Sequence, residues 1–269
     1  MRGTPRPYVI FSSMASLSII STRGDIVESV HRVSAAVVGA DGRVVGWSGE
    51  PDLVTYWRSA AKPFQAMPLI EDGAADRWKL SEQELALTSA SHSSEPIHLE
   101  VTDGFLKKIG CTEADLACGP HLPLGSAVAD RVLKEGLHPT PRWSNCSGKH
   151  SGMLALAKHH GWPTAGYNAT GHPVQTRILE SVTAWTDTPP DRIQLGVDGC
   201  TAANFALPLS AMALAYARFG TRNHPAAERL RKAMLAHPEL VAGTGRPCTD
   251  LMRAVPGQLI AKVGAEGIY

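Results

Sequence analysis

The chain has 269 residues and 43% of them are apolar, so it is long enough to bury a substantial hydrophobic core. Its 26 basic and 25 acidic side chains leave a formal net charge of +1, which argues against a nucleic-acid or membrane partner and favours a small molecule. Five cysteines are an odd number for a disulfide scaffold, so we expect a reducing, cytoplasmic compartment.

The N-terminus imitates a weak signal peptide. Arg2 and Arg6 precede a fairly apolar stretch at residues 8–20, but four serines interrupt that stretch and no small-residue cleavage site is clear after it. No other segment is long and apolar enough to span a bilayer. We therefore expect residues 1–23 to be a poorly ordered extension, with Met14 as a plausible start, and residues 24–269 to form the folded domain.

The first predicted elements are a hairpin and a helix. Two β-rich runs between residues 33 and 47 flank Asp41-Gly42, a dipeptide that supplies the positive φ angles of a tight turn. Residues 59–70 then predict a helix, which Pro63 and Pro68 must distort or confine to its first turns.

The remaining elements follow from caps and apolar patterns. Residues 81–84 read as a capping box before a short helix, and another helix begins near Pro96. The other predicted elements are a helix at 147–160 ended by Gly161, a helix at 173–185, a buried strand at 193–197, helices at 205–219 and 225–237, and a strand at 258–263. We find no internal repeat or linker, so we expect one α/β domain.

The strongest local signal is a serine three residues before a lysine, Ser59 and Lys62, which places both on one helical face. A serine hydroxyl is a poor nucleophile until a neighbour removes its proton, and a lysine whose pKa falls through burial can act as that base. The spacing is the Ser-x-x-Lys signature of serine acyl-transfer enzymes. The same spacing also arises by chance in most proteins.

Two further segments have the positions that such enzymes require. A serine-rich loop at residues 89–94 can present a second hydroxyl, and Lys262-Val263-Gly264 can form a late Lys-x-Gly strand. Alone, the loop reads as an N-cap for the Pro96 helix and the lysine as a solvated edge-strand charge. The three features in the expected order favour a shared pocket.

A second constellation combines the block 145–150, Asn-Cys-Ser-Gly-Lys-His, with Asp198-Gly199-Cys200. Two thiolates and a third donor can hold zinc and leave one position open, although lysine is a rare ligand because it must lose its proton. The alternatives are a disulfide, which is disfavoured inside cells, and two buried thiols that pack as small apolar groups. Ser147 and Gly148 open a helix, whose free N–H groups favour an anion.

Taken together, these motifs resemble the asparaginase family typified by the thermolabile, inducible rhizobial enzyme. The resemblance runs from about Gly24 to Tyr269. It rests on Val27-Glu28-Ser29-Val30-His31-Arg32, Arg58-Ser59-Ala60-Ala61-Lys62-Pro63, Ser89-Ala90-Ser91-His92-Ser93, the 145–150 block, Asp198-Gly199-Cys200 and Lys262-Val263-Gly264-Ala265-Glu266-Gly267. It implies hydrolysis of L-asparagine to L-aspartate and ammonia. It also implies an α/β (α+β) fold similar to serine β-lactamases and glutaminases, that is, an antiparallel sheet with flanking helices and a separate helical subdomain. We also expect a homodimer.

The resemblance assigns roles to individual residues. Its nucleophile and paired lysine correspond to Ser59 and Lys62, and its second Ser-Lys pair to Ser91 and Lys262. Its zinc ligands correspond to Cys146, Lys149 and Cys200. Arg58, His92, His150 and Asp198 are expected to contact the substrate or the side chains that hold it.

The chain also departs from the family pattern. Relatives supply a proline soon after the Asp-Gly-Cys motif, where this chain has residues 201–204, Thr-Ala-Ala-Asn. Relatives also continue for several tens of residues beyond the Lys262 block, so we expect a C-terminally incomplete domain whose final strand exposes an edge. Two rival interpretations remain, a penicillin-recognising serine acyl-transferase or β-lactamase and a truncated, inactive homologue.

Overall fold

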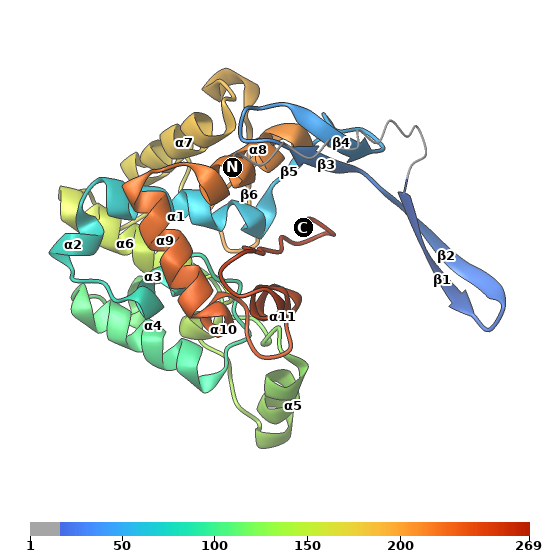
Figure 1. Cartoon of the computed structure of the whole chain (residues 1–269). Coiled ribbons are helices and arrows are strands. Elements are labelled where there is room, and N and C mark those ends of the chain that lie inside the picture. The colour runs from blue at the N-terminus through green and yellow to red at the C-terminus, as the bar shows by residue number, and fades with distance from the viewer. Residues whose placement is uncertain (1–16) are drawn as a thin grey trace, which may run out of the picture.

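The computed structural model describes residues 17–269, and it is a mixed α/β protein whose body is mainly helical (Figure 1). The strands form three small antiparallel sheets, ordered β1-β2, β3-β4 and β5-β7-β6. The strands are β1 (Leu17–Arg23), β2 (Ile26–Val33), β3 (Ala35–Val38), β4 (Val44–Ser48), β5 (Val54–Tyr56), β6 (Gln194–Val197) and β7 (Ala203–Pro208). The helices are α1 (Lys62–Glu71), α2 (Ala74–Arg77), α3 (Glu82–Thr88), α4 (Pro96–Lys108), α5 (Ser126–Glu135), α6 (Ser147–His160), α7 (Pro173–Thr186), α8 (Leu209–Thr221), α9 (Pro225–Ala236), α10 (Pro238–Val241) and α11 (Pro247–Ala254).

The first hairpin, β1-β2, stands away from the helical body (Figure 1). Residues 1–16 of the predicted extension, including the plausible start at Met14, lie outside the described residues. The rest of that extension, Leu17–Arg23, is strand β1 and pairs along its whole length with β2. Regular structure therefore begins before residue 24, because the apolar residues of this stretch belong to a strand ladder.

Most of the predicted elements are present. The β3-β4 hairpin turns at Gly42, whose φ is +88°, as the Asp-Gly signal predicts. Ser81 and Glu84 form the expected capping box at the start of α3. Helix α6 ends at Gly161, whose φ of +71° is the left-handed C-cap.

Two predicted elements are wrong in part or in full. The helix expected at 205–219 begins only at Leu209, because residues 203–208 form β7, the central strand between β5 and β6. Backbone pairing on both edges outweighs the helical pattern there. The strand expected at 258–263 is not a strand, and the backbone N–H of Val263 donates instead to the thiol of Cys248 at 3.1 Å.

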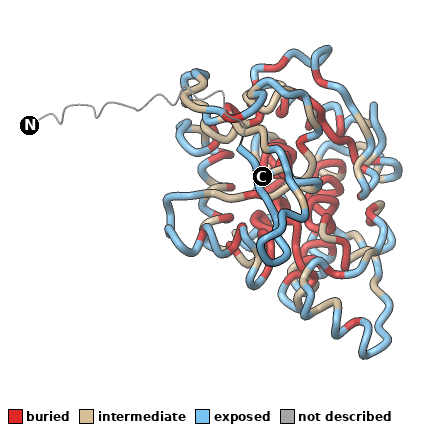
Figure 2. The backbone as a smooth tube through the Cα atoms, turned by 90° about the vertical axis from the view of Figure 1, so that its right-hand side faces the viewer, coloured by how far each residue is buried: buried red, intermediate tan, exposed pale blue. Residues whose placement is uncertain are grey.

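The core lies where the helices meet, and the buried part of the backbone is concentrated there (Figure 2). Its centre is an aromatic cluster around Phe64 of α1, whose ring stacks on Trp57 at 4.8 Å and meets Tyr216 edge-on at 5.2 Å. Such pairs stabilise beyond simple burial. Because Trp57 and Phe64 flank the Ser-x-x-Lys segment, the core fixes that segment from both ends.

Candidate active site

The segment that carries Ser59 is a strained turn. Residues Arg58–Ala61 form a 3₁₀ turn that leads directly into α1. Arg58 has a φ of +54°, a left-handed conformation that costs about 1–3 kcal/mol in a non-glycine residue. Asn204 of β7 holds this backbone, since its Oδ1 accepts the Arg58 N–H at 3.0 Å.

Ser59 itself is half-buried, and its hydroxyl makes no hydrogen bond with any residue between 17 and 269. It precedes Lys62 by three residues on a continuous helical path, so both side chains lie on the same face. The hydroxyl is thus partly accessible from outside, and among the described residues it forms no hydrogen bond with the amine of Lys62.

Lys62 is fully buried at the start of α1. Its Nζ donates to the carbonyl oxygen of Ala90 at 2.5 Å, to Ser91 Oγ at 3.1 Å and to the carbonyl oxygen of Asn145 at 3.4 Å. All three donors of an ammonium group are thereby used. The carbonyl dipoles compensate the burial of this amine.

Ser91 brings the two predicted Ser-Lys pairs together. Its Oγ lies 3.1 Å from Lys62 Nζ and 2.7 Å from Lys262 Nζ, so one hydroxyl bridges two amines. Burial lowers the pKa of Lys262 well below its usual range, and the nearby charge of Lys62 lowers it further. Both amines donate to the same Ser91 oxygen, and Lys262 Nζ also donates to the carbonyl oxygen of Val263 at 2.7 Å.

The loop at 89–94 is buried, unlike the ordinary exposed N-cap that was its alternative interpretation. The N-cap of α4 is Glu95. The backbone N–H of Ser91 donates to the carbonyl of Val241 at 2.9 Å, and Ser93 Oγ donates to the carbonyl of Ala242 at 3.0 Å. The end of α10 therefore sets the position of Ser91.

His92, an expected substrate contact, faces inward. It is fully buried, its Nε2 lies 2.8 Å from Ser147 Oγ, and its Nδ1 accepts the Ser94 N–H at 3.2 Å. Its ring stacks on His98 at 4.9 Å. Burial, with the neighbouring His98, lowers the pKa of His92 well below its usual range. Both ring nitrogens are occupied, so the contacts of His92 order the loop.

Arg58 and Asp198 form an ion pair at the outer side of the strained turn. Arg58 Nε lies 3.1 Å from Asp198 Oδ1, and both side chains are only partly exposed. The same carboxylate oxygen accepts the Gly199 N–H at 2.9 Å. Arg58 and Asp198 thus place one cation and one anion in contact at this turn.

The predicted metal ligands converge. Lys149 Nζ donates to Cys200 Sγ at 3.1 Å, and Cys146 and Cys200 are neighbouring buried thiols. A hydrogen bond from Cys146 lowers the pKa of Cys200 far below its usual range, with help from Lys149, and raises the pKa of Cys146. Burial lowers the pKa of Lys149, but the attraction of the Cys200 thiolate outweighs burial, so the pKa of Lys149 is raised overall.

The donor set matches zinc in part. Two thiols are donors that zinc prefers, whereas the Lys149 amine must lose its proton to coordinate, and its raised pKa opposes that loss until a metal displaces the proton. All five cysteines, each of them within the described chain, are free thiols, so no disulfide competes for Cys146 or Cys200. The neighbouring His150 has a buried Nε2 without a hydrogen-bond partner, while its Nδ1 lies 2.6 Å from the hydroxyl of Tyr167.

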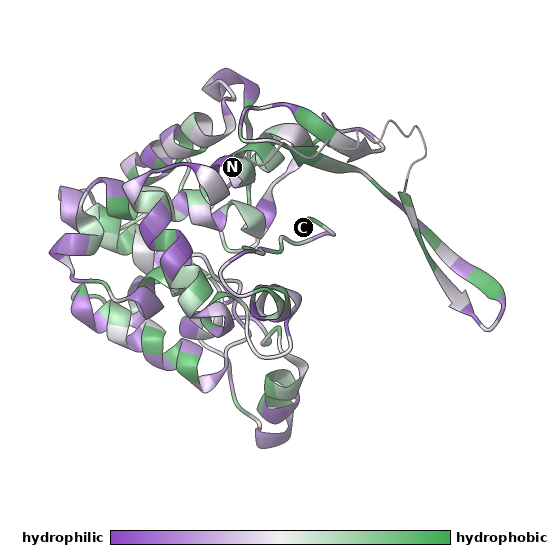
Figure 3. Cartoon of the chain, in the orientation of Figure 1, coloured by the Kyte–Doolittle hydropathy of each residue, from purple (hydrophilic) through white to green (hydrophobic). Residues whose placement is uncertain are grey.

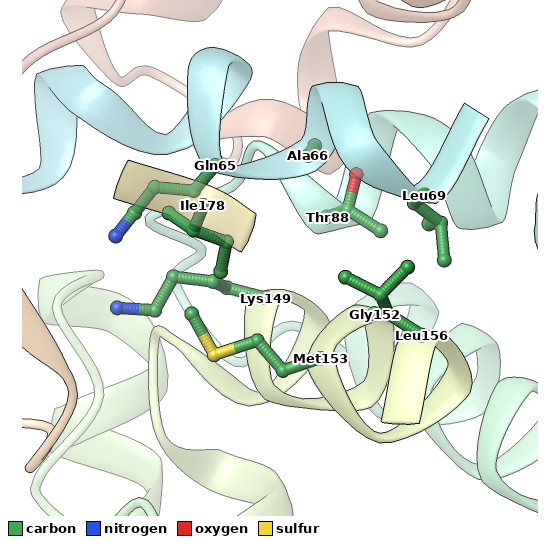
Figure 4. A pocket seen from close by; sticks show the side chains of 9 residues that line it. All are labelled: Gln65, Ala66, Leu69, Thr88, Lys149, Gly152, Met153, Leu156 and Ile178. Atoms are coloured by element: carbon green, nitrogen blue, oxygen red, sulfur yellow. The ribbon is translucent and has the colours of Figure 1, made fainter. Parts of the chain in front are cut away.

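A small cavity lies against the stem of Lys149, between α1, α3, α6 and α7 (Figure 4). Its volume of about 10 Å³ holds roughly one water molecule, so it is not a substrate site. Figure 4 shows the amine of Lys149 and the amide of Gln65 on the same side of the cavity, away from Leu69 and Leu156. The apolar wall thus directs the amine towards the thiols.

These features point to one family. A family model described as L-asparaginase II matches residues 19–269. The chain belongs to the L-asparaginase II family. A search of curated proteins returned no significant match. Family membership makes the chain an amidohydrolase whose reaction is the hydrolysis of L-asparagine, and the resemblance found in the sequence is confirmed.

In this L-asparaginase, sequence reasoning missed two asparagines that organise the site. Asn204 holds Arg58, and it stands in the very stretch that departs from the family pattern. Asn145 accepts from Lys62 and from the His92 N–H through its carbonyl, while His121 Nε2 contacts both the Asn145 N–H and its Oδ1. Asn145 opens the most specific motif of the chain, but no sequence signal singles out His121.

Among residues 17–269, no helix is long and apolar enough to cross a membrane.

Proposed function

We propose that this L-asparaginase opens the side-chain amide of L-asparagine with Ser59 as nucleophile. The observation that carries the proposal is the pair of contacts at Ser91 Oγ, one from the amine of Lys62, three residues after Ser59, and one from the amine of Lys262, whose pKa burial lowers. Ser59 is the accessible serine, whereas Ser91 is buried and already bonded twice. A nucleophile must meet its substrate, so accessibility favours Ser59.

The two lysines would act through a proton relay. Lys62 passes a proton to Ser91 Oγ, and Ser91 passes its own proton to Lys262, which leaves Lys62 as a neutral base. Lys62 then takes the Ser59 proton as Ser59 Oγ attacks the amide carbon. The carbon–nitrogen bond breaks as Lys62 protonates the leaving nitrogen and releases ammonia. Water then hydrolyses the β-aspartyl ester, with Lys62 taking a proton from the water and returning it to Ser59 Oγ.

Substrate recognition would use the groups beside the strained turn. The ion pair between Arg58 and Asp198 would open when the substrate binds. Arg58 would then bind the α-carboxylate of asparagine, and Asp198 would bind its α-ammonium group. His92 and His150 would act behind these groups as buried supports.

Cys146, Lys149 and Cys200 would hold zinc, which would supply a Lewis acid near the substrate. We also propose a serine β-lactamase-like fold type, a cytoplasmic location and a homodimer. The fold type is supported by the contacts at Ser91, where the lysine of the Ser-x-x-Lys segment, the second serine loop and Lys262 meet. The free thiols support the reducing location.

The decisive experiment measures ammonia release from L-asparagine and L-glutamine with wild type and Ser59→Ala, each with and without a chelator. We expect asparagine hydrolysis by wild type and loss of it in the variant. Turnover by Ser59→Ala would contradict the proposed nucleophile. A chromogenic β-lactam assay on the same samples separates the penicillin-recognising alternative, and folded wild type without any turnover would support the inactive one.

A further inference from the structure

The β1-β2 hairpin has one open edge. Strands β2 and β3 follow one another with only Ser34 between them, and β1 and β4 pair with them on the same side. The ends of β1 and β4 meet there, because Ser48 Oγ accepts the Leu17 N–H at 2.7 Å and donates to the carbonyl of Val33 at 3.3 Å. In the described part of the chain, no strand pairs with the opposite edge of β2. An unpaired strand edge is a template for another strand.

The hairpin is also apolar and without packing partners. Leu17, Ile19, Ile20, Ile26, Val27 and Val30 are each more than half exposed. The ribbon leaves the body, and its outer half alternates hydrophobic and hydrophilic segments (Figure 3). An isolated two-stranded hairpin is marginally stable in water, and a sheet needs three or more strands with a hydrophobic face to be stable by itself. The hairpin therefore gains stability from further strands.

The sequence of β2 is complementary to itself. In an antiparallel pair of strands, successive opposed residue pairs alternate between a hydrogen-bonded and a non-hydrogen-bonded type. A two-fold axis makes equivalent pairs identical in type, so it must pass through the middle of a pair formed by one residue and its own copy. Centring on Val30 places Glu28 opposite the second copy's Arg32, Ser29 opposite His31, and Val30 opposite Val30. Centring on Ser29 or His31 instead places Glu28 opposite Val30 or Ser34.

Charge supports the same register. Arg32 is exposed and has no ion pair among residues 17–269. Glu28 pairs with Arg23 in its own chain, but that contact is highly exposed and contributes little. Glu28 is also the unpaired residue of a β-bulge between β1 and β2, so the regular edge of β2 ends there. Two-fold symmetry creates two Glu28–Arg32 contacts at once.

We propose that the open edge of β2 binds the same edge of a second copy of this chain. Residues 28–32 of the two copies pair antiparallel about Val30 and join the two hairpins into one four-stranded sheet. The second copy is the partner because, among the strands of residues 17–269, β2 alone supplies acidic, apolar and basic residues in the reversed order that the edge requires.

Charge exchange tests the partner and the register together in the full chain. Sedimentation velocity across a wide range of concentrations should show a dimer for wild type. Arg32→Glu and Glu28→Arg each place like charges opposite one another and should raise the dimer Kd by about tenfold or more. The double variant Glu28→Arg with Arg32→Glu should restore dimerisation. Arg43→Glu, in the exposed turn of the neighbouring hairpin, is the matched control and should have no effect.

Cross-linking tests the register without reversing charge. Val30→Cys should form an intermolecular disulfide under mild oxidation, because the two Cβ atoms of an opposed pair lie about 4.5–5.5 Å apart. Ser29→Cys should not, since the new thiol in each copy would face His31 of the other. A monomeric wild type, a Kd insensitive to Arg32→Glu, or cross-linking at 29 instead of 30 would each overturn the proposal. A monomer that dimerises only after removal of residues 1–16 would show that the chain's own start occupies the edge, and would also overturn it.

Discussion

The two serines of the site differ in almost every physical respect. Ser59 is half-buried, lies in a strained turn and makes no hydrogen bond within the described chain, whereas Ser91 is buried and contacts two lysine amines. A nucleophile must be free to approach its substrate, and a relay must be held in place. The comparison indicates that the chain divides reactivity and proton handling between two hydroxyls.

The surroundings of the two serines follow the same division. The Ser59 turn is held by one asparagine at a backbone of unfavourable φ. The Ser91 loop is fixed by backbone bonds to Val241 and Ala242, and Lys262 is fixed through the bond from Val263 to Cys248. The first region stores strain, and the second is rigid and almost saturated with hydrogen bonds. Ordered by their effect on turnover, the following changes test that division.

The largest effect is expected from Ser59→Ala. Removal of the nucleophile should lower kcat for asparagine by about 10³-fold or more, as in other serine hydrolases. The melting temperature should change little, because the Ser59 hydroxyl has no partner among the described residues. Steady-state ammonia release checks this, with Ser126→Ala on the exposed start of α5 as the matched control. Loss of turnover in Ser91→Ala together with its survival in Ser59→Ala would reverse the roles of the two serines.

Lys262→Met should lower kcat by roughly 100-fold, because it removes the proton acceptor behind Ser91. It should also change how stability depends on pH. Burial lowers the pKa of Lys262, so between that pKa and the ordinary value the folded chain binds fewer protons than the unfolded chain. Wild-type stability therefore rises with pH in this window. Urea unfolding at neutral and mildly alkaline pH should show a smaller rise in the variant, and an unchanged rise would contradict a lowered pKa of Lys262.

A smaller loss is expected from Asn204→Ala. Without the Asn204 acceptor, the strained Arg58 backbone can relax, and kcat should fall by about 10-fold while stability falls by about 1–2 kcal/mol. Asn204→Asp keeps an oxygen at the same place and should recover most of the activity. If the two variants behave alike, the side-chain oxygen does not position the turn.

Sequence patterns predicted the local parts of this site well. The capping box of α3, the C-cap of α6 and the Asp-Gly hairpin each depend on a few neighbouring residues, and all three are confirmed. The family resemblance also grouped Ser91 with Lys262 across a long stretch of chain, and the structure places their polar atoms 2.7 Å apart. The order of the motifs along the chain predicted this pairing, because local helix or strand propensities say nothing about contacts between distant residues.

The failures arise where distant segments decide the outcome. Residues 205–208 have a helical pattern, but two neighbouring strands draw them into a sheet. Residues 258–263 have a strand pattern, but the hydrogen bond from Val263 goes to a thiol of α11. Asn204 carried no signal, because its role depends on the φ of Arg58, which no pattern in the sequence reveals.

The smallest effect on turnover is expected at His98, which supports the Ser91 loop by stacking on His92. Burial lowers the pKa of His98 to about 4, so this imidazole stays neutral in the folded chain while it is protonated in the unfolded chain below about pH 6.5. The folded state should therefore lose roughly 3 kcal/mol as the pH falls from 6.5 to 4. His98→Gln can keep the bonds to the Glu95 N–H and the Glu239 carbonyl without this titration. Its unfolding free energy should fall less steeply with acid while kcat at neutral pH is retained, and an equally steep fall would place the acid sensitivity elsewhere in the rigid region.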